Sequence, residues 1–230
     1  MFPWSRSPHA QLHGPDVLYL LTDPVFLIFT GALLFWLVGG QLRGRYWSPF
    51  GWISERRQIG QLGKEISARP HDLTLRLDHG KLCVKHKQWK QAEASLAPVV
   101  ERRETSAEAW YFLGRAQLGL KRVDEGLAAI DRALELRPDL LYGEPQMVVG
   151  DHYRAAKDWA RARTAFEALV ETNASSSEGY YKLGLCCREL GDKEAARRAL
   201  AESVAAHEHV PKYKRRENRP WKWRAKLTRV

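Results

Sequence analysis

A glycine that recurs at a nearly constant interval is the feature that most constrains this 230-residue chain. The interval is 34 residues, with one exception of 36, and the glycines are Gly80, Gly114, Gly150 and Gly184. Alignment on them gives four gapless copies, with Leu141-Tyr142 inserted between the second and the third: 73–106, 107–140, 143–176 and 177–210. A period of this length is typical of arrays in which each unit is one supersecondary motif and neighbouring units stack.

Two further positions of each copy follow the same period. The twentieth position is small in every copy, and its residues are Ala92, Gly126, Ala162 and Ala196. The twenty-fourth position is large and apolar, and its residues are Leu96, Ile130, Phe166 and Leu200. Small residues let two helices approach closely, and large apolar residues fill the space beside them. The pattern therefore predicts a hairpin of two packed helices in each copy, and the hairpins must stack because one alone cannot bury its apolar face.

This pattern resembles the tetratricopeptide repeat. The second copy matches the family at nearly all of its characteristic places, with Trp110, Leu113, Gly114, Ile130, Ala133 and Pro138. The fourth copy also matches well, with Tyr180, Leu183, Gly184, Ala196 and Leu200. The first and third copies depart in the first helix, where Arg76 and Gln146 stand at the usual tryptophan position. The resemblance covers residues 73–210 and implies an all-α fold, an α-solenoid of four helix-turn-helix hairpins.

The resemblance also implies a binding site for proteins. In this family the first helix of each hairpin lines a concave groove through positions two, five, nine and twelve of the copy. The partner-binding residues expected from these positions are Leu77, Lys81, Glu108, Tyr111, Arg115, Met147, Asp151, Arg154, Tyr181, Leu185 and Arg188, beside Thr74, Val84, Leu118, Glu144 and Glu178. Tyr, Met, Leu and Arg together are typical of binding hot spots. One subtype clamps the C-terminal carboxylate of chaperones with Lys and Asn at positions five and nine of its first repeat, and Leu77 and Lys81 disfavour that partner.

The N-terminal part of the chain contains an uncharged stretch at 24–42. Asp23 and Pro24 are typical of a helix start. A helix over the stretch would extend about 28 Å, enough to cross the apolar core of a bilayer. Only Arg6 precedes it, so the basic start of a cleaved signal peptide is missing. The sequence therefore predicts an uncleaved transmembrane helix at 24–42, after a short N-terminal segment at 1–23.

Basic residues after this stretch indicate an orientation. Arg43 and Arg45 follow it closely, whereas Arg6 is nearly alone before it. The positive-inside rule then predicts a single-pass membrane protein with its N-terminus outside and its repeats in the cytoplasm. An inverted topology would instead make the repeats a periplasmic or lumenal scaffold.

Residues 43–72 form a basic juxtamembrane connector. A short helix capped by Ser54 would carry Ile59, Leu62 and Ile66 along one face. That face suits either the membrane surface or the first repeat, and the sequence leaves both alternatives open.

The net charge of +10 is concentrated at the C-terminus. Residues 73–210 hold 21 charges of each sign, whereas the tail at 211–230 holds nine basic residues and one acidic residue. Pro220 is expected to break any helix in this tail. Basic residues interleaved with tryptophan suit anionic lipid, RNA or an acidic protein, and a merely solvated tail is the alternative. The candidate contacts are Lys212, Lys214, Arg215, Arg216, Trp221, Lys222, Trp223 and Arg224.

No motif for catalysis, cofactor binding or metal binding is recognisable in the sequence. The recurring glycines are packing positions and do not form a phosphate-binding loop. The stretch 207–209, His-Glu-His, lacks the spacing of the zinc-protease motif HExxH. Cys83 and Cys187 both fall at position eleven of their copies, so we expect them in the core. The sequence therefore predicts a protein that is not an enzyme and that has no cofactor and no catalytic or metal-binding residues.

Two functions agree with these patterns. The first is a membrane-anchored scaffold whose groove recruits, assembles or stabilises a membrane protein complex, as a permanent subunit or as a transient assembly factor. The anchor would raise the effective concentration of the groove for membrane-bound partners. The second is a nucleic-acid or ribosome tether that acts through the basic tail, and its binding would depend steeply on salt. The partner's identity and the oligomeric state stay open.

Overall fold

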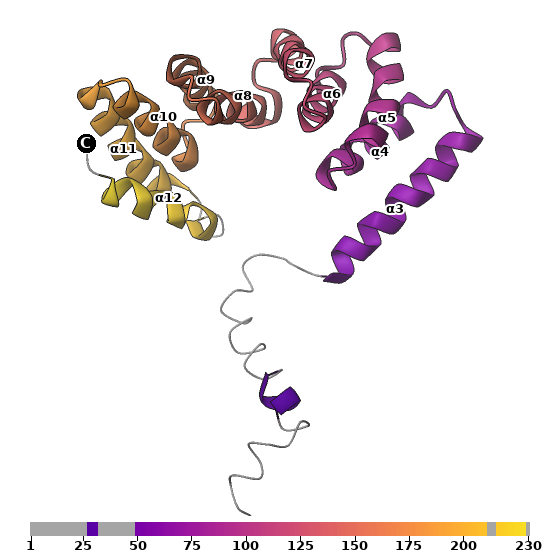
Figure 1. Ribbon diagram of the computed structural model, residues 1–230, viewed down its shortest axis with the longest axis horizontal. Coiled ribbons are helices and arrows are strands. Elements are labelled where there is room, and N and C mark those ends of the chain that lie inside the picture. The colour runs from indigo at the N-terminus through magenta and orange to yellow at the C-terminus, as the bar shows by residue number, and fades with distance from the viewer. Residues whose placement is uncertain (1–26, 32–48, 211–214, 229–230) are drawn as a thin grey trace, which may run out of the picture. The chain divides into compact units, whose positions relative to one another are not determined.

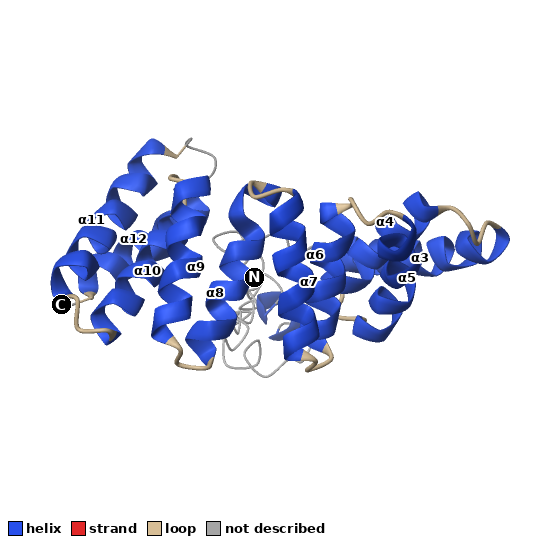
Figure 2. Cartoon of the chain, turned by 90° about the horizontal axis from the view of Figure 1, so that it is seen from above, coloured by secondary structure: helices blue, strands red, loops and turns tan. Residues whose placement is uncertain are grey.

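The computed structural model describes residues 27–31, 49–210 and 215–228 (Figure 1). The chain divides into two compact units, Met1–Ser48 and Pro49–Val230. The regular elements of the second unit that the structure describes are helices (Figure 2). They are, in chain order, α3 (Pro49–Ala68), α4 (Leu73–Lys85), α5 (Trp89–Arg102), α6 (Ala107–Gly119), α7 (Val123–Leu136), the 3-10 turn η1 (Leu140–Gly143), α8 (Glu144–Ala155), α9 (Trp159–Thr172), α10 (Ser177–Glu189), α11 (Lys193–His209) and α12 (Arg215–Leu227).

The first unit corrects the prediction of a membrane span. Its described residues, 27–31, are helical. The apolar core of a bilayer is about 30 Å thick. Among all the described residues, no helix combines the length and the apolar character that a crossing requires. The prediction of a transmembrane helix at 24–42 rested on the absence of charge, and this finding contradicts it.

The predicted localisation is corrected together with the span. An outside N-terminus and a cytoplasmic repeat array were inferred from basic residues that flank a span. No spanning helix is found in the part of the chain that the structure describes, so these charges assign no side of a membrane. The segment 1–23 and the rest of 24–42 lie outside the described residues.

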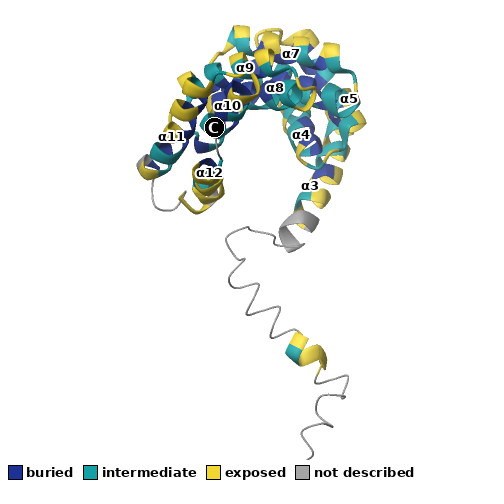
Figure 3. Cartoon of the chain, turned by 60° about the vertical axis from the view of Figure 1, so that its left-hand side comes forward, coloured by how far each residue is buried: buried dark blue, intermediate teal, exposed yellow. Residues whose placement is uncertain are grey.

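Four helical hairpins confirm the all-α solenoid predicted from the glycine period. Helix α4 packs with α5, α6 with α7, α8 with α9, and α10 with α11. Within the second unit the hairpins follow one another in a row, with α4, α8 and α10 on its inner side and α5, α7, α9 and α11 on its outer side (Figure 3). The boundaries assigned to the individual domains stay predictions.

The recurring glycine lies where the two helices of a hairpin touch. A Cβ atom on Gly114 would lie 2.6 Å from the carbonyl oxygen of Gly126 and 2.7 Å from Cγ1 of Ile130. A Cβ atom on Gly80 would lie 2.5 Å from the side chain of Leu96. Such distances are too short for any side chain, and the backbone of Gly126 cannot rotate away as a side chain can. The period in the sequence therefore records close helix packing.

Polar side chains begin the first helix of three hairpins. The Asp72 carboxylate accepts hydrogen bonds from the backbone N–H groups of Thr74, at 3.0 Å, and Leu75, at 3.2 Å. The hydroxyl groups of Ser106 and Ser176 accept equivalent bonds at the starts of α6 and α10. These caps satisfy N–H groups that have no partner within the helix.

Each hairpin turns through a residue with left-handed backbone geometry. This residue stands at position fifteen of every copy, and the φ angles are 59° at Lys87, 69° at Lys121, 60° at Lys157 and 81° at Gly191. An L-residue in this region costs about 1–2 kcal/mol relative to the right-handed region, whereas glycine adopts it freely. The fourth copy therefore makes the turn with less strain than the other three.

The inserted dipeptide forms the turn η1 between the second and third hairpins. Leu141, Tyr142 and Gly143 have successive φ angles of 49°, 54° and 88°. Leu140, at the start of the turn, is fully buried, whereas Tyr142 is 82% exposed. The insertion is thus absorbed by a left-handed turn that is anchored by one apolar side chain.

Helix α3 decides between the two alternatives for the connector. It begins at Pro49 and packs against α4, with Ile59 buried in the core that the first two hairpins share. Glu55 on α3 accepts a hydrogen bond from Nζ of Lys85 at 2.6 Å and lies 2.9 Å from Nε2 of His86. Bonding to Lys85, and then to His86, lowers the pKa of Glu55. The helix therefore extends the solenoid by packing against its first repeat.

All three cysteines are buried and free, which confirms the expectation for Cys83 and Cys187. Burial raises the pKa of the Cys83 and Cys186 thiols to about 11 and also raises the pKa of Cys187. The thiols are therefore protonated at neutral pH and behave as small apolar core groups.

The described part of the C-terminal tail forms α12, which packs against α11 and α10. Pro220 lies inside this helix, so the expectation that it would break any helix is wrong. Proline removes one backbone donor, but Ala225 is buried against the array and Arg215 donates a hydrogen bond to the carbonyl oxygen of Val210 at 2.9 Å. Tertiary packing thus holds a helix that the local sequence disfavours.

Candidate protein-binding groove

The residues predicted to line the groove lie on α4, α6, α8 and α10, in differing environments. Those that are partly or well exposed are Lys81, Glu108, Arg115, Met147, Asp151, Arg154, Tyr181, Leu185 and Arg188. Leu77 is half-buried against the core of the first two hairpins. Tyr111 is fully buried, so its ring is not available to a partner.

Ion pairs join neighbouring first helices at regular positions. Nζ of Lys81, at position nine of the first copy, lies 2.6 Å from Oε2 of Glu108, at position two of the second. Nη1 of Arg115, at position nine of the second copy, lies 2.9 Å from Oε1 of Glu144, at position two of the third. The side chains of Lys81 and Arg115 each keep 31% of their surface exposed. We call this series of pairs the ion ladder.

The ion ladder changes at the last junction. Position nine of the third copy is Asp151, an acid, so it cannot pair with the acid Glu178 at position two of the fourth. The ammonium group of Lys182 lies between them, 2.6 Å from Oδ2 of Asp151 and 2.6 Å from Oε1 of Glu178. The Lys182 side chain is only 9% exposed, and the two carboxylates compensate the burial of its charge.

Sequence reasoning missed Lys182. It stands at position six, which the family pattern does not assign to the groove. The sequence nevertheless contained a signal for a cation here. Position nine is a cation in the first two copies and an acid in the third, so the acids at the last junction need a cation from another position. Lys182 also lies 6.0 Å from the centre of the Phe166 ring.

The polar contacts of Tyr111 are with other residues of the array. Its hydroxyl group donates a hydrogen bond to Oε1 of Glu144 at 2.8 Å, and Arg115 lies 3.3 Å from the same hydroxyl. Burial raises the pKa of Tyr111 far above its usual value, so the phenol remains a donor. This residue therefore fixes the Glu144 carboxylate for its ion pair with Arg115.

The groove and the tail meet at α10. The rings of Tyr181 on α10 and Trp221 on α12 lie 5.7 Å apart, and Nζ of Lys182 lies 5.8 Å from the Trp221 ring centre. The guanidinium carbon of Arg224 lies 4.6 Å from the centre of the Trp221 ring. Two residues predicted for separate sites, Tyr181 and Trp221, thus contact each other.

The remaining tail residues have separate environments. Trp223 is 53% exposed. Lys222 pairs with Glu208 at 3.3 Å, and Arg215 donates to the backbone of α11. Arg216 is exposed, and Lys212 and Lys214 lie outside the described residues. The structure therefore does not present the tail as one continuous surface of cations and indoles.

The chemistry of this face is that of non-covalent recognition. Its cations and carboxylates are partly exposed and held in place by one another. Among the residues that the structure describes, no cluster of three or more His, Cys, Asp or Glu side chains has the arrangement of a metal site. These charges lie beside apolar surface from Met147 and Leu185, which are partly exposed.

Several solved structures share the helical-hairpin fold of this chain. The solved structure of MamA has 24% sequence identity, with 65% of this chain and 86% of MamA covered and a TM-score of 0.59. MamA from Desulfovibrio magneticus RS-1 has 17% identity, 68% and 94% coverage and a TM-score of 0.51. YrrB, described as a tetratricopeptide repeat protein with an unusual peptide-binding site, has 17% identity, 71% and 88% coverage and a TM-score of 0.53. At these identities the likeness shows a shared fold. No curated protein sequence matches significantly.

The family comparison is more specific than the structural one. The model of the tetratricopeptide repeat matches residues 77–140 and 150–211, more than half of the chain. The two matched segments leave out residues 141–149, which are the rest of the turn η1 after Leu140 and the first half of α8. The chain belongs to the tetratricopeptide repeat family, whose fold serves as a scaffold for interactions between proteins.

Proposed function

We propose that this chain is a non-catalytic scaffold that binds a peptide or helical segment of another protein along the inner face of α4, α6, α8 and α10. The observation that carries the proposal is the ion ladder, which holds partly exposed charges at fixed places across consecutive first helices. Preorganised charges beside apolar side chains favour recognition because little side-chain entropy is lost on binding. YrrB, which shares the fold, is described as having a peptide-binding site, and this adds support.

The ligand proposed here differs from the partner that the sequence predicted, because it is a protein segment and not a membrane complex. The sequence predicted a membrane complex as the partner because it predicted an anchor, and the described residues contain no spanning helix. The proposal therefore names a protein segment as the ligand. The tether function has less support than the sequence suggested, because base stacking needs accessible aromatic rings and, of the two tail tryptophans, Trp221 packs against Tyr181 and Arg224 and Trp223 alone is well exposed.

A peptide-display selection against the full chain tests this proposal. Selected peptides should bind the wild type and lose about tenfold or more in affinity with Lys81→Glu or Arg154→Glu, because each change reverses a charge on the inner face. The matched control is Arg132→Glu on the outer helix α7, where Arg132 pairs only with its near neighbour Glu135 at 2.8 Å. Equal losses in the control, or no selected peptide that depends on Lys81 or Arg154, would contradict the groove as the binding site.

A further inference from the structure

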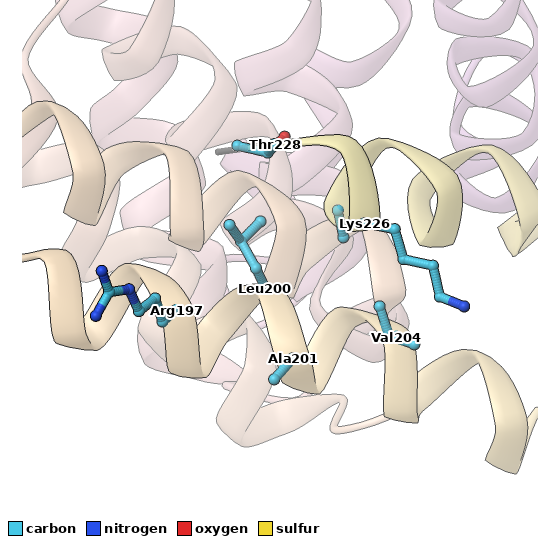
Figure 4. A pocket seen from close by; sticks show the side chains of 7 residues that line it. Arg197, Leu200, Ala201, Val204, Lys226 and Thr228 are labelled. Carbon is cyan, nitrogen blue, oxygen red and sulfur yellow. The ribbon is translucent and has the colours of Figure 1, made fainter. Parts of the chain in front are cut away.

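The C-terminal edge of the array contains a trough of about 330 Å³ between α11 and α12. Arg197, Leu200, Ala201 and Val204 lie along its α11 side, and Lys226 and Thr228 along its α12 side (Figure 4). Leu200 and Ala225 form a buried apolar floor, each at most 6% exposed, and Ala201 is exposed. Neither Trp221 nor Tyr181 is among the residues that line the trough.

The place of α12 in the repeat pattern indicates what shape fits this trough. Helix α12 packs against both helices of the preceding hairpin, α11 and α10, as α6 packs against α5 and α4. It thus occupies the place of the first helix of a fifth hairpin. In each complete hairpin a second helix covers the first, whereas no helix in the described part of the chain covers the trough. A helix laid there would complete the hairpin.

Side-chain sizes in the trough agree with a helical occupant. Ala201 and Ala225 are small, as are the residues at positions eight and twenty of the repeats, where helices approach closely. Leu200 and Val204 supply the apolar contact beside them. Small and large residues in alternation form the grooves into which the ridges of a second helix pack.

The charge around the trough determines the second property of the occupant. Helix α12 carries six basic residues and one acidic residue. Lys226 and Arg197 stand at the margins of the trough. Helix α11 carries three basic and three acidic residues, of which Glu208 pairs with Lys222, so the net positive charge comes from α12. This field attracts carboxylates and repels cations.

We propose that the α11–α12 trough binds an acidic amphipathic helix of a partner protein, with the apolar face of that helix on Leu200 and Val204 and its carboxylates beside Arg197 and Lys226. A helix that packs its apolar face into such a recess is a common mode of recognition. A lipid surface fits less well, because the apolar floor is recessed and a membrane is a broad surface without a ridge to enter it. RNA fits less well, because α12 carries two tryptophans and only one of them, Trp223, is well exposed for base stacking.

The test uses the full chain and a synthetic amphipathic helix with leucine along one face and glutamate on the other. Its fluorescence anisotropy should report saturable binding, and a matched peptide with lysine in place of glutamate should not bind. Ala201→Trp fills the trough from an exposed position and should weaken binding by about tenfold or more, equivalent to ~1.4 kcal/mol. Lys226→Glu should weaken it by a similar factor, and Arg132→Glu on α7 should leave it unchanged. Circular dichroism confirms that each variant is folded.

Three results would overturn the proposal. The first is equal binding of the glutamate and lysine peptides, and the second is full affinity in both Ala201→Trp and Lys226→Glu. The third is that phosphatidylglycerol vesicles or oligouridine RNA bind more tightly than the glutamate peptide, and that Trp223→Ala weakens this binding whereas Ala201→Trp does not. That last result would assign the surface to lipid or to RNA. The inner-face variants Lys81→Glu and Arg154→Glu should not affect the acidic helix, so this test and the groove test fail separately.

Discussion

The junction between the second and third hairpins differs from the junctions on either side of it. Helices α5 and α6, and helices α9 and α10, pack extensively across short links, whereas α7 and α8 make few contacts across the turn η1. At this middle junction Leu140, buried in the turn, joins an apolar cluster that includes Ile130 and Val149, and Glu144 makes polar bonds with Tyr111 and Arg115. The comparison shows that, where the 34-residue period is strict, the second helix of one hairpin packs along the first helix of the next. Where two residues are inserted, these two helices make fewer contacts, and the turn and a few specific bonds contribute instead. Stability in a solenoid depends on such nearest-neighbour interfaces.

The largest expected effect comes from removing the apolar anchor of the middle junction. Leu140→Ala should lower the free energy of unfolding by about 2–5 kcal/mol, because it removes a fully buried side chain and leaves a cavity. Tyr142→Ala in the same turn should change it by less than about 0.5 kcal/mol, since Tyr142 is 82% exposed. Urea denaturation followed by circular dichroism measures both. Similar losses in the two variants would mean that the turn is not anchored by Leu140.

A second prediction compares polar bonds at the middle and first junctions. Glu144→Ala should cost about 1–3 kcal/mol, because the buried Tyr111 hydroxyl loses its acceptor. In a Tyr111→Phe background the same change should cost much less, because no buried donor is left unsatisfied. At the first junction, Lys81→Met removes a half-exposed ion pair and should cost less than about 1 kcal/mol. A double-mutant cycle by urea denaturation measures the coupling, and strict additivity would contradict the role given to Tyr111.

The spacing of small residues was sufficient to predict the hairpins. Gly114 and Gly126 had to lie at a helix contact because no other arrangement explains small residues at two fixed positions of every copy, and their atoms do meet there. The burial of Cys83 and Cys187 followed from the same register. These predictions succeeded because each rests on a local pattern that is repeated four times.

Features that depend on tertiary packing could not be predicted from local sequence patterns. Pro220 is a helix breaker by local propensity, and α12 forms through it because Trp221 and Ala225 pack on the array. The left-handed turn at Leu141 and Tyr142 has no sequence signal, since neither residue type favours that geometry. The membrane prediction rested on the lack of charge at 24–42, and it is contradicted because no helix among the described residues combines the length and the apolar character of a span.

A smaller effect is expected at the turn inside each hairpin, where the copies can be compared directly. Lys121→Gly should raise the free energy of unfolding by about 0.5–1 kcal/mol, because its φ of 69° is strained for an L-residue. Gly191→Ala should lower it by about 1 kcal/mol, since φ is 81° there and no neighbouring atom would clash with the new Cβ. Thermal unfolding measures both shifts. If Lys121→Gly left the free energy of unfolding unchanged, the backbone at Lys121 would not be strained.

The smallest expected effect concerns pH and distinguishes the first hairpin from the others. Position seven is leucine or valine in the second, third and fourth copies, but it is His79 in the first, buried and 2.7 Å from Oγ of Ser95. Burial, with a smaller contribution from Arg76, lowers the pKa of His79 below its usual value. The unfolded state then binds the proton more readily than the folded state. The contribution of His79 to stability is therefore complete above the unfolded pKa of about 6.5 and is lost as the pH falls from there toward the lowered folded pKa.

The free energy of unfolding should accordingly decrease between pH 7 and pH 5, and the decrease should be smaller in the double variant His79→Leu/Ser95→Ala. The serine is changed as well, so that no buried hydroxyl group loses its partner. His71→Gln, at an exposed position before α4, is the control and should preserve the full decrease. Urea denaturation at a series of pH values measures these differences. An unchanged decrease in the double variant would show that His79 does not distinguish the first hairpin, and the middle junction would then be the main departure from the regular array.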